Sequence, residues 1–326
     1  MAQQRNFTID YFRLLMTFLI VALHSSPFLE YNAIISYFPS QVLSRIGVPF
    51  FASVAGYYFF KDYKCNYKKT ALKYFIKYSF WSVIYFIFIK IFLNQDFSVI
   101  KSLVTYFFTG YYHLWYMLAI IYTIALLWII SKIPNAIKFF FYFTFVFLTL
   151  GIMMFGYGNI FLKLPIFRNT LGILNAKVNM QTEWLFSIVP FFMIGYALQY
   201  KSKFIDWLYF KCDIFLAIFS VIYVFEIFAL EIFNLKSSTT LCLSTYPLVF
   251  FIMLFSLKHS QIGNITLAKY TSGIASFIYF SHIIFVLLLQ KFGFSQTPTF
   301  FITIISTTIL GFIIVKVNNR TLNKLM

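Results

Sequence analysis

Residues 9–28 read IDYFRLLMTFLIVALHSSPF, an almost uninterrupted run of apolar side chains. The hydrocarbon core of a bilayer is about 30 Å thick, and a helix needs about 20 apolar residues to cross it. The run therefore predicts a first membrane-spanning helix. The same signal predicts further spans at 42–60, 74–93, 112–131, 138–157, 183–200, 213–233, 239–257, 272–290 and 297–315. Together they predict an all-α, polytopic integral membrane bundle of about ten transmembrane helices.

The composition of the whole chain agrees with that fold class. Of its 326 residues, 61% are hydrophobic and 11% are charged, whereas a soluble domain carries about 25% charged residues to cover its surface. We therefore expect a single transmembrane domain over 1–326, with no soluble domain beside it. The first apolar run contains Arg13 and His24 and lacks a small-residue cleavage site. It is therefore predicted to be a retained span and not a signal peptide.

Two segments between the spans stand out. The stretch 98–110 is apolar but short, which is typical of an interfacial or re-entrant helix. Residues 158–182 form the longest stretch that is not apolar. We expect an outer loop there that faces a substrate.

Lysine and arginine indicate the orientation of the chain. They gather in the loops that are internal if the N-terminus is internal, most densely in the run of six lysines from Lys61 to Lys77. Because cytoplasmic loops carry an excess of Lys and Arg, both termini are predicted to be cytoplasmic. The net charge of +17 then reflects topology, and no nucleic-acid partner is expected. The lysine run is also suited to attract anionic membrane lipid or a phosphorylated cofactor.

Arg13 and His24 are the most informative residues of the first span, because an ionisable side chain inside a bilayer is costly unless it is paired or hydrated. They are 11 residues apart. At about 100° per residue, this spacing is three turns plus about 20°, which places both side chains on one helix face, about 16 Å apart along the axis. The alternative is that Arg13 reaches the inner headgroups and His24 hydrogen-bonds a neighbouring helix.

Five further polar residues lie in or beside predicted spans. Arg45 and His113 stand at outer helix ends, where an interface anchor is the alternative to a site residue. Glu183 opens a span, where a carboxylate also suits the positive end of the helix dipole. Glu226 lies within a span and is expected either to pair with an arginine or to line a cavity. His282 lies mid-span, as a site residue or as a structural histidine.

The motifs of soluble enzymes are absent from the sequence. It contains no Walker loop, no dinucleotide-binding glycine pattern and no nucleophile-elbow serine. The three cysteines, Cys65, Cys212 and Cys242, do not have a metal-binding spacing. No metal site is predicted.

Five short motifs together resemble those of the acyltransferase-3 family of multi-span membrane proteins. In that family the first helix carries a basic residue and, after ten intervening residues, a histidine. The resemblance covers nearly the full chain, and the motifs follow the order of the family. They are Arg13 to His24, Arg45 to Phe51 with Gly56-Tyr57, His113 to Tyr116, Pro190 to Tyr196, and Ile278 to His282.

The resemblance implies an O-acyltransferase of a bacterial plasma membrane that moves an acyl group, most simply acetyl from cytoplasmic acetyl-CoA, to a hydroxyl of a glycan or lipid-linked saccharide. In this hypothesis Arg13 binds phosphate groups of the acyl-CoA, because a guanidinium suits that geometry. His24 is the general base, because imidazole titrates near the working pH. Glu183 is predicted to orient His24. The predicted acceptor-binding residues are Arg45, His113, Trp115, Tyr116 and His282.

A second resemblance supports a different function. The segments His24 to Phe28 and Arg45 to Phe51 are similar to those of the membrane half of vancomycin-resistance serine racemases, which is associated with serine uptake. A transporter of a small polar solute such as L-serine is therefore the alternative hypothesis. Racemisation is not expected, because the chain lacks the racemase half. A scaffold or lipid-binding protein without turnover is a third hypothesis, and a homodimer is one assembly that the sequence leaves open.

Overall fold

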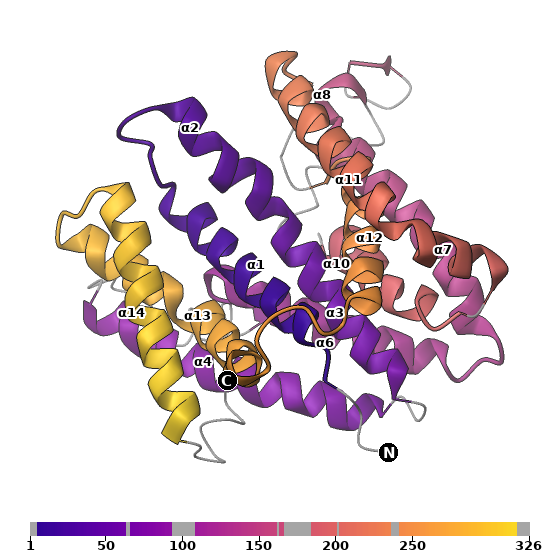
Figure 1. The fold of residues 1–326 in the computed structure, drawn as a ribbon, viewed down its shortest axis with the longest axis horizontal. Helices are drawn as coiled ribbons and strands as arrows, with labels where there is room; N and C mark the ends of the chain where they lie inside the picture. Colours follow the sequence, from indigo (N-terminus) through magenta and orange to yellow (C-terminus); the bar gives the residue numbers. More distant parts are fainter. Residues whose placement is uncertain are drawn as a thin grey trace. The chain divides into compact units, whose positions relative to one another are not determined.

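The computed structural model describes residues 5–62, 66–92, 108–161, 163–165, 184–200, 202–235 and 241–317. In this part of the chain the secondary structure is helical and contains no strand, which confirms the predicted all-α class. Figure 1 shows the helices, coloured along the sequence.

Within the described residues, eight helical stretches are long and apolar enough to cross a membrane. Five of them are single helices, namely α1 (Phe7–Ser25), α4 (Tyr67–Phe92), α11 (Lys203–Ile232), α13 (Ile265–Lys291) and α14 (Gln296–Val317). The other three stretches are composite. The first consists of α2 (Ala33–Tyr37), η1 (Phe38–Val42), η2 (Leu43–Ile46) and α3 (Gly47–Lys61). The second consists of η3 (Tyr112–Leu114) and α6 (Trp115–Ile130), and the third of α7 (Ala136–Gly151) and η4 (Ile152–Gly156).

Two of the predicted spans correspond to shorter apolar helices. Segment 183–200 overlaps α10 (Trp184–Ala197), and segment 239–257 overlaps α12 (Thr245–Lys258). Each has 14 residues and a length of about 21 Å, less than the hydrocarbon thickness of about 30 Å. The chain is thus a multi-pass membrane protein with at least eight candidate spans. The total of ten and the cytoplasmic termini stay predictions.

The two segments noted between the spans lie largely outside the described residues. Of the predicted interfacial helix at 98–110, only residues 108–110 are described. Of the predicted loop at 158–182, the structure describes the short helix α8 (Gly158–Phe161) and residues 163–165.

The chain divides into two compact units, each assembled from separate stretches of sequence. The first contains Met1–Gly47, Lys73–Leu118 and His259–Met326, and the second contains Val48–Leu72 and Ala119–Lys258. The proposal of a single domain over 1–326 stays a prediction.

In the first unit, α13 packs against both α1 and α14. Helices α1 and α13 run in the same direction: the amide of Phe7 donates to the Ser260 carbonyl (2.9 Å) and the Tyr11 hydroxyl to the Asn264 carbonyl (3.1 Å) at their starts. Residues of small volume let α14 lie close to its neighbours. The buried residues of α14 are Thr299, Thr303, Thr307 and Gly311, spaced four apart on one face.

The second unit contains two close helix pairs, α7 with α10 and α11 with α12. It also contains a backbone contact between α3 and α10 at Gly56 and Gly195. A Cβ atom at Gly56 would lie 1.9 Å from the Phe192 carbonyl oxygen, and one at Gly195 would lie 2.2 Å from the Tyr57 amide nitrogen. Only glycine allows the two helices to approach this closely, as small residues do in other membrane bundles.

Candidate functional site

Three histidines from distant parts of the chain meet in the first unit. His24 is in the last turn of α1, His113 is in η3 and His282 is in α13. The ring centroids of His113 and His282 are 4.6 Å apart, those of His24 and His282 5.3 Å, and those of His24 and His113 6.5 Å. We call these three side chains the histidine cluster.

Backbone contacts select the tautomer of His282. Its Nδ1 lies 3.0 Å from the Ile278 carbonyl oxygen and 2.8 Å from the Tyr279 carbonyl oxygen. A carbonyl oxygen only accepts, so Nδ1 carries the proton and, in the neutral ring, Nε2 carries the lone pair. His282 is fully buried, and its Nε2 has no hydrogen-bond partner among the described residues. Its Nε2 can therefore accept a proton or a hydrogen bond.

His113 is also buried and has polar atoms to spare. It is 5% exposed, and neither of its ring nitrogens has a hydrogen-bond partner in the described part of the chain. Buried polar atoms in native proteins are usually paired, and exceptions often mark functional sites. The cluster therefore offers three buried ring nitrogens without a partner among the described residues, two from His113 and one from His282.

Tyrosines hold the segments that carry the cluster. The Tyr279 hydroxyl donates to the His113 carbonyl (2.8 Å), which ties α13 to η3. The Tyr85 hydroxyl donates to the Phe280 carbonyl (2.9 Å), which ties α13 to α4. Because these bonds are buried, they hold the turn of α13 that precedes His282.

The predicted aromatic residues of the acceptor site lie at the start of α6. Tyr116 is buried, and its ring centroid lies 6.0 Å from that of Tyr279. Trp115 is half-buried at the first position of α6. Tyr116 thus shares a neighbour with the histidine cluster, since the Tyr279 ring centroid is also 4.8 Å from that of His113.

Arg45 lies in η2, in the same unit. Its Nη2 donates to the Gln41 side-chain oxygen (2.7 Å), one turn earlier, and its side chain is half-buried.

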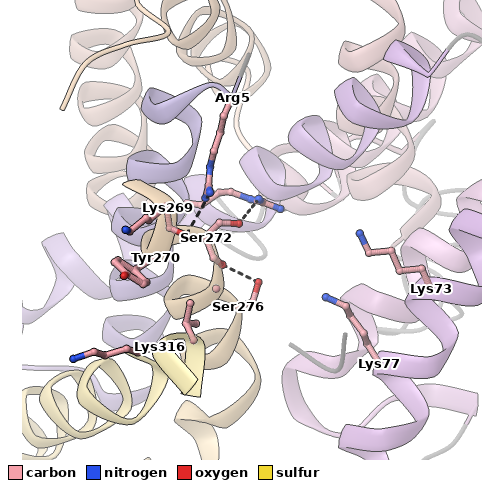
Figure 2. A pocket seen from close by; sticks show the side chains of 11 residues that line it. Arg5, Lys73, Lys77, Lys269, Tyr270, Ser272, Ser276 and Lys316 are labelled. Atoms are coloured by element: carbon pink, nitrogen blue, oxygen red, sulfur yellow. Dashed lines mark hydrogen bonds between the residues drawn. The ribbon is translucent and has the colours of Figure 1, made fainter. Parts of the chain in front are cut away.

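Arg13 lies in a different place, on the wall of a strongly basic cavity of about 620 Å³. Its Nη1 donates to the Ser272 hydroxyl of α13 (2.9 Å). Figure 2 shows Lys73 and Lys77 on one side of this space, and Arg5, Ser272 and Ser276 across from them. The cavity is lined by Arg5, Arg13, Lys73, Lys77, Lys269, Tyr270, Ser272, Gly273, Ser276, Val315 and Lys316.

Sequence reasoning missed most of this cavity. It interpreted the lysine run as an inner-side anchor that is also suited to attract anionic lipid or a phosphorylated cofactor, without selecting any of its lysines. The signal that selects two of them is the spacing of Lys73 and Lys77. Residues four apart lie on the same face of a helix. The contributions of Lys269 and Lys316 have no comparable signal, because they come from the other end of the chain.

Helix α13 connects the cavity with the histidine cluster. Arg13 bonds to Ser272, and the ring of His24 lies beside that of His282. Ser272 and His282 are ten residues apart, about 15 Å along the helix. Arg13 and His24 therefore both contact α13, one at each end of this interval.

Of the two glutamates that the sequence indicated, the structure describes one. Glu183 lies outside the described residues. Glu226 is in the second unit and holds the start of α12: its carboxylate accepts from the amides of Leu243 (2.7 Å) and Ser244 (2.8 Å) and from the Tyr157 hydroxyl (2.5 Å). It neither pairs with an arginine nor lines the basic cavity among the described residues.

In the ranges that the structure describes, no group of three or more His, Cys, Asp or Glu side chains has an arrangement that could hold a metal ion.

Comparison with known proteins gives a family match over nearly the whole chain. A family model described as "Acyltransferase domain" matches residues 6–316. A protein named amino-acid racemase from Enterococcus faecalis is 31% identical over 135 residues, which are 38% of this chain and 18% of that protein. The chain therefore matches less than a fifth of the length of that relative. No solved structure matches the chain.

Proposed function

Because this chain belongs to the acyltransferase-3 family, we propose that it is an integral membrane O-acetyltransferase of a bacterial plasma membrane. It takes an acetyl group from cytoplasmic acetyl-CoA and transfers it to a hydroxyl of a cell-envelope glycan or lipid-linked saccharide. One observation carries the proposal: α13 joins a basic cavity, suited to phosphates, to a cluster of histidines, suited to proton transfer.

The basic cavity is the proposed site of the CoA phosphates. It is lined by six cationic side chains, and its volume of about 620 Å³ is within the usual range of about 300–1,000 Å³ for small-molecule sites. Arg13 binds phosphate through its planar guanidinium, and the lysines contribute point charges. The extended pantetheine arm then places the thioester away from the phosphates, toward His24.

His24 is the proposed general base. It removes the proton of the acceptor hydroxyl, the oxygen attacks the thioester carbonyl, and the carbon–sulfur bond breaks to release the CoA thiolate. The proton on His24 then neutralises the thiolate. His282 and His113 hydrogen-bond the acceptor or His24 through their unpaired nitrogens. Glu183 remains our candidate for orienting His24.

Acetyl transfer by the purified protein tests this proposal. The protein is reconstituted in nanodiscs with radiolabelled acetyl-CoA, and release of label and binding of CoA are measured. We expect His24→Ala to lower turnover by about 10²-fold or more, as for loss of a general base, while CoA still binds. Arg13→Ala is expected to weaken CoA binding. A mass comparison of surface glycans with and without the gene identifies the acceptor.

Two results would contradict the proposal. Absence of both CoA binding and acetyl release in the wild-type protein would rule out the acyl donor. Unchanged glycan acetylation in His24→Ala and Arg13→Ala cells, at normal protein abundance, would rule out the assigned residues. His259→Ala is the matched control, because that histidine lies outside the cluster, between α12 and α13.

A transporter of a small zwitterion such as L-serine is the second candidate. The similarity of 135 residues to a protein named amino-acid racemase favours it. In that case Arg13 and His24 contact the solute along its path. Uptake of labelled serine into proteoliposomes without acetyl-CoA, abolished by Arg13→Ala, would support the transporter over the acetyltransferase.

A further inference from the structure

A buried carboxylate lies beside Arg5 and Arg13, the two arginines in the lining of the basic cavity. Asp10, in the first turn of α1, has a side chain that is 5% exposed. Its Oδ2 accepts from Arg5 Nε at 2.5 Å, whereas its Oδ1 lies 3.7 Å from Arg13 Nη1. The first contact is a charge-assisted hydrogen bond, and the second exceeds hydrogen-bonding distance.

The two arginines are thus used differently. Arg5 is engaged with the protein, because its Nη1 also donates to the Lys269 carbonyl (3.3 Å), as Figure 2 shows. Arg13 makes one hydrogen bond, from Nη1 to Ser272. Its other N–H groups have no partner among the described residues, and its side chain is 30% exposed on the cavity wall.

The two guanidinium groups compete for one carboxylate. A carboxylate that lacks a direct partner in a buried site draws the nearest cation, because an unpaired buried charge is costly. If Arg5 did not occupy Asp10, Arg13 would be the cation nearest to it. The N–H groups of Arg13 would then be committed to Asp10.

We propose that Arg5 is a positioning residue that occupies Asp10 and so keeps the Arg13 guanidinium available for phosphate groups. This inference rests on the proposed function, in which Arg13 binds the phosphates of acyl-CoA. It assigns to Arg5 an effect through Asp10, in addition to the positive charge that every cation of the cavity supplies.

A double-mutant cycle separates this effect from a direct contact. Arg5→Gln is expected to weaken CoA binding about tenfold, as expected when a charge-assisted hydrogen bond to the ligand is lost. The double variant Arg5→Gln/Asp10→Asn is expected to bind CoA within about threefold of the wild type, because a neutral amide no longer attracts Arg13. Asp10→Asn alone is expected to bind at least as tightly as the wild type.

Two controls are matched to the variants. Lys269→Gln removes the same unit charge from the same cavity, and we expect a smaller loss of CoA affinity than for Arg5→Gln. Asp206→Asn changes an aspartate at the same fourth position of a helix, α11, without an arginine contact among the described residues. Thermal unfolding of all variants in nanodiscs verifies that they are folded.

Binding is measured with CoA and, separately, with inorganic diphosphate at low ionic strength. The inference is overturned if the double variant binds no better than Arg5→Gln, or if Arg5→Gln loses no more affinity than Lys269→Gln. If diphosphate shows the cycle and CoA binds to no variant, the inference stands and acyl-CoA is the wrong ligand. If neither probe binds to the wild type, both proposals are overturned.

Discussion

His282 illustrates how a single side chain in this protein is specified by its own helix. Its Nδ1 donates to carbonyls three and four residues earlier, at Tyr279 and Ile278. That bond turns Nε2, the nitrogen with the lone pair, away from its own backbone. A histidine that is locked in this way can accept a proton at one defined atom.

Replacement of His282 by phenylalanine tests this role. His282→Phe retains a ring of similar size and removes both nitrogens, so we expect turnover to fall by about 10-fold to 100-fold, within the range for loss of a proton-handling group. The KM for acetyl-CoA is expected to stay nearly constant, because the basic cavity is about 15 Å away along α13. Steady-state kinetics measures both values.

Tyr85→Phe is the control for that variant. It removes a buried hydrogen bond to the neighbouring Phe280 carbonyl but leaves the histidine cluster intact. The loss of one neutral hydrogen bond corresponds to about a fivefold decrease in turnover, so Tyr85→Phe is expected to lower turnover less than His282→Phe does. An equal loss in both variants would indicate that His282 only supports the packing.

At the scale of helices, close contacts in the second unit depend on glycine and on one half-buried carboxylate. Helices α3 and α10 touch through Gly56 and Gly195. The start of α12 is held by Glu226 of α11, whose carboxylate accepts hydrogen bonds from the two amides that directly precede α12, those of Leu243 and Ser244. Each feature supplies an interaction between helices that the hydrophobic effect does not supply in lipid.

Gly56→Ala and Gly195→Ala are each expected to destabilise the protein by about 1–3 kcal/mol, the usual cost of overpacking. The added methyl group would collide with backbone atoms, which cannot rotate away. Gly311→Ala in α14 is the matched control, because its Cβ would lie 3.3 Å or more from its neighbours. Thermal unfolding in detergent provides the comparison, and equal midpoints for all three variants would contradict the expectation.

Glu226→Ala is expected to destabilise the protein by at least about 2 kcal/mol, since the two amides and the hydroxyls of Tyr157 and Ser244 lose this acceptor. Burial, and then the hydrogen bond to Glu226, raises the pKa of Tyr157 well above its ordinary value. Because the folded-state pKa is raised, the Tyr157 contribution to stability persists below the unfolded pKa of about 10 and falls above it.

Unfolding measured against pH tests this relation. The wild type is expected to lose stability as the pH rises above about 10, and Tyr157→Phe is expected to reduce this loss. Glu231→Ala serves as a control for the glutamate, because its side chain is exposed at the end of the same helix. An Ala variant at Glu226 that is as stable as the one at Glu231 would contradict the role of Glu226.

At the scale of the whole molecule, the proposed function requires the two ends of α13 to face different compartments. The charge pattern predicts that the start of α1 and the basic cavity are on the cytoplasmic side. It follows from that prediction that the histidine cluster lies toward the outer side, where the proposed acceptor is. This vectorial arrangement suits an enzyme whose donor and acceptor are on opposite sides of a membrane.

Cysteine labelling tests that orientation. In a background without native cysteines, Tyr31→Cys places a thiol in the exposed segment after α1, and Ile262→Cys places one before α13. We expect an impermeant maleimide to label Tyr31→Cys in intact cells and Ile262→Cys only after permeabilisation. The reverse pattern would invert the topology and move the basic cavity away from cytoplasmic acetyl-CoA.

The sequence by itself determined the membrane class, the approximate position of the long apolar helices and the family. Hydropathy is a property of about 20 consecutive residues, so it can be read without knowing the fold. Arg13 and His24 lie on one helix, so their spacing alone could place them on the same helix face. The sequence also indicated His113 and His282, but as separate residues.

The tertiary structure alone decided which of these residues meet. Arg13 and Ser272 are 259 positions apart, and no local pattern relates them. Packing of α1 against α13 brought His24 beside His282, η3 added His113, and α4 and α14 completed the six cations around one cavity. Such contacts depend on which helix faces fit together, and that fit is a property of the whole bundle.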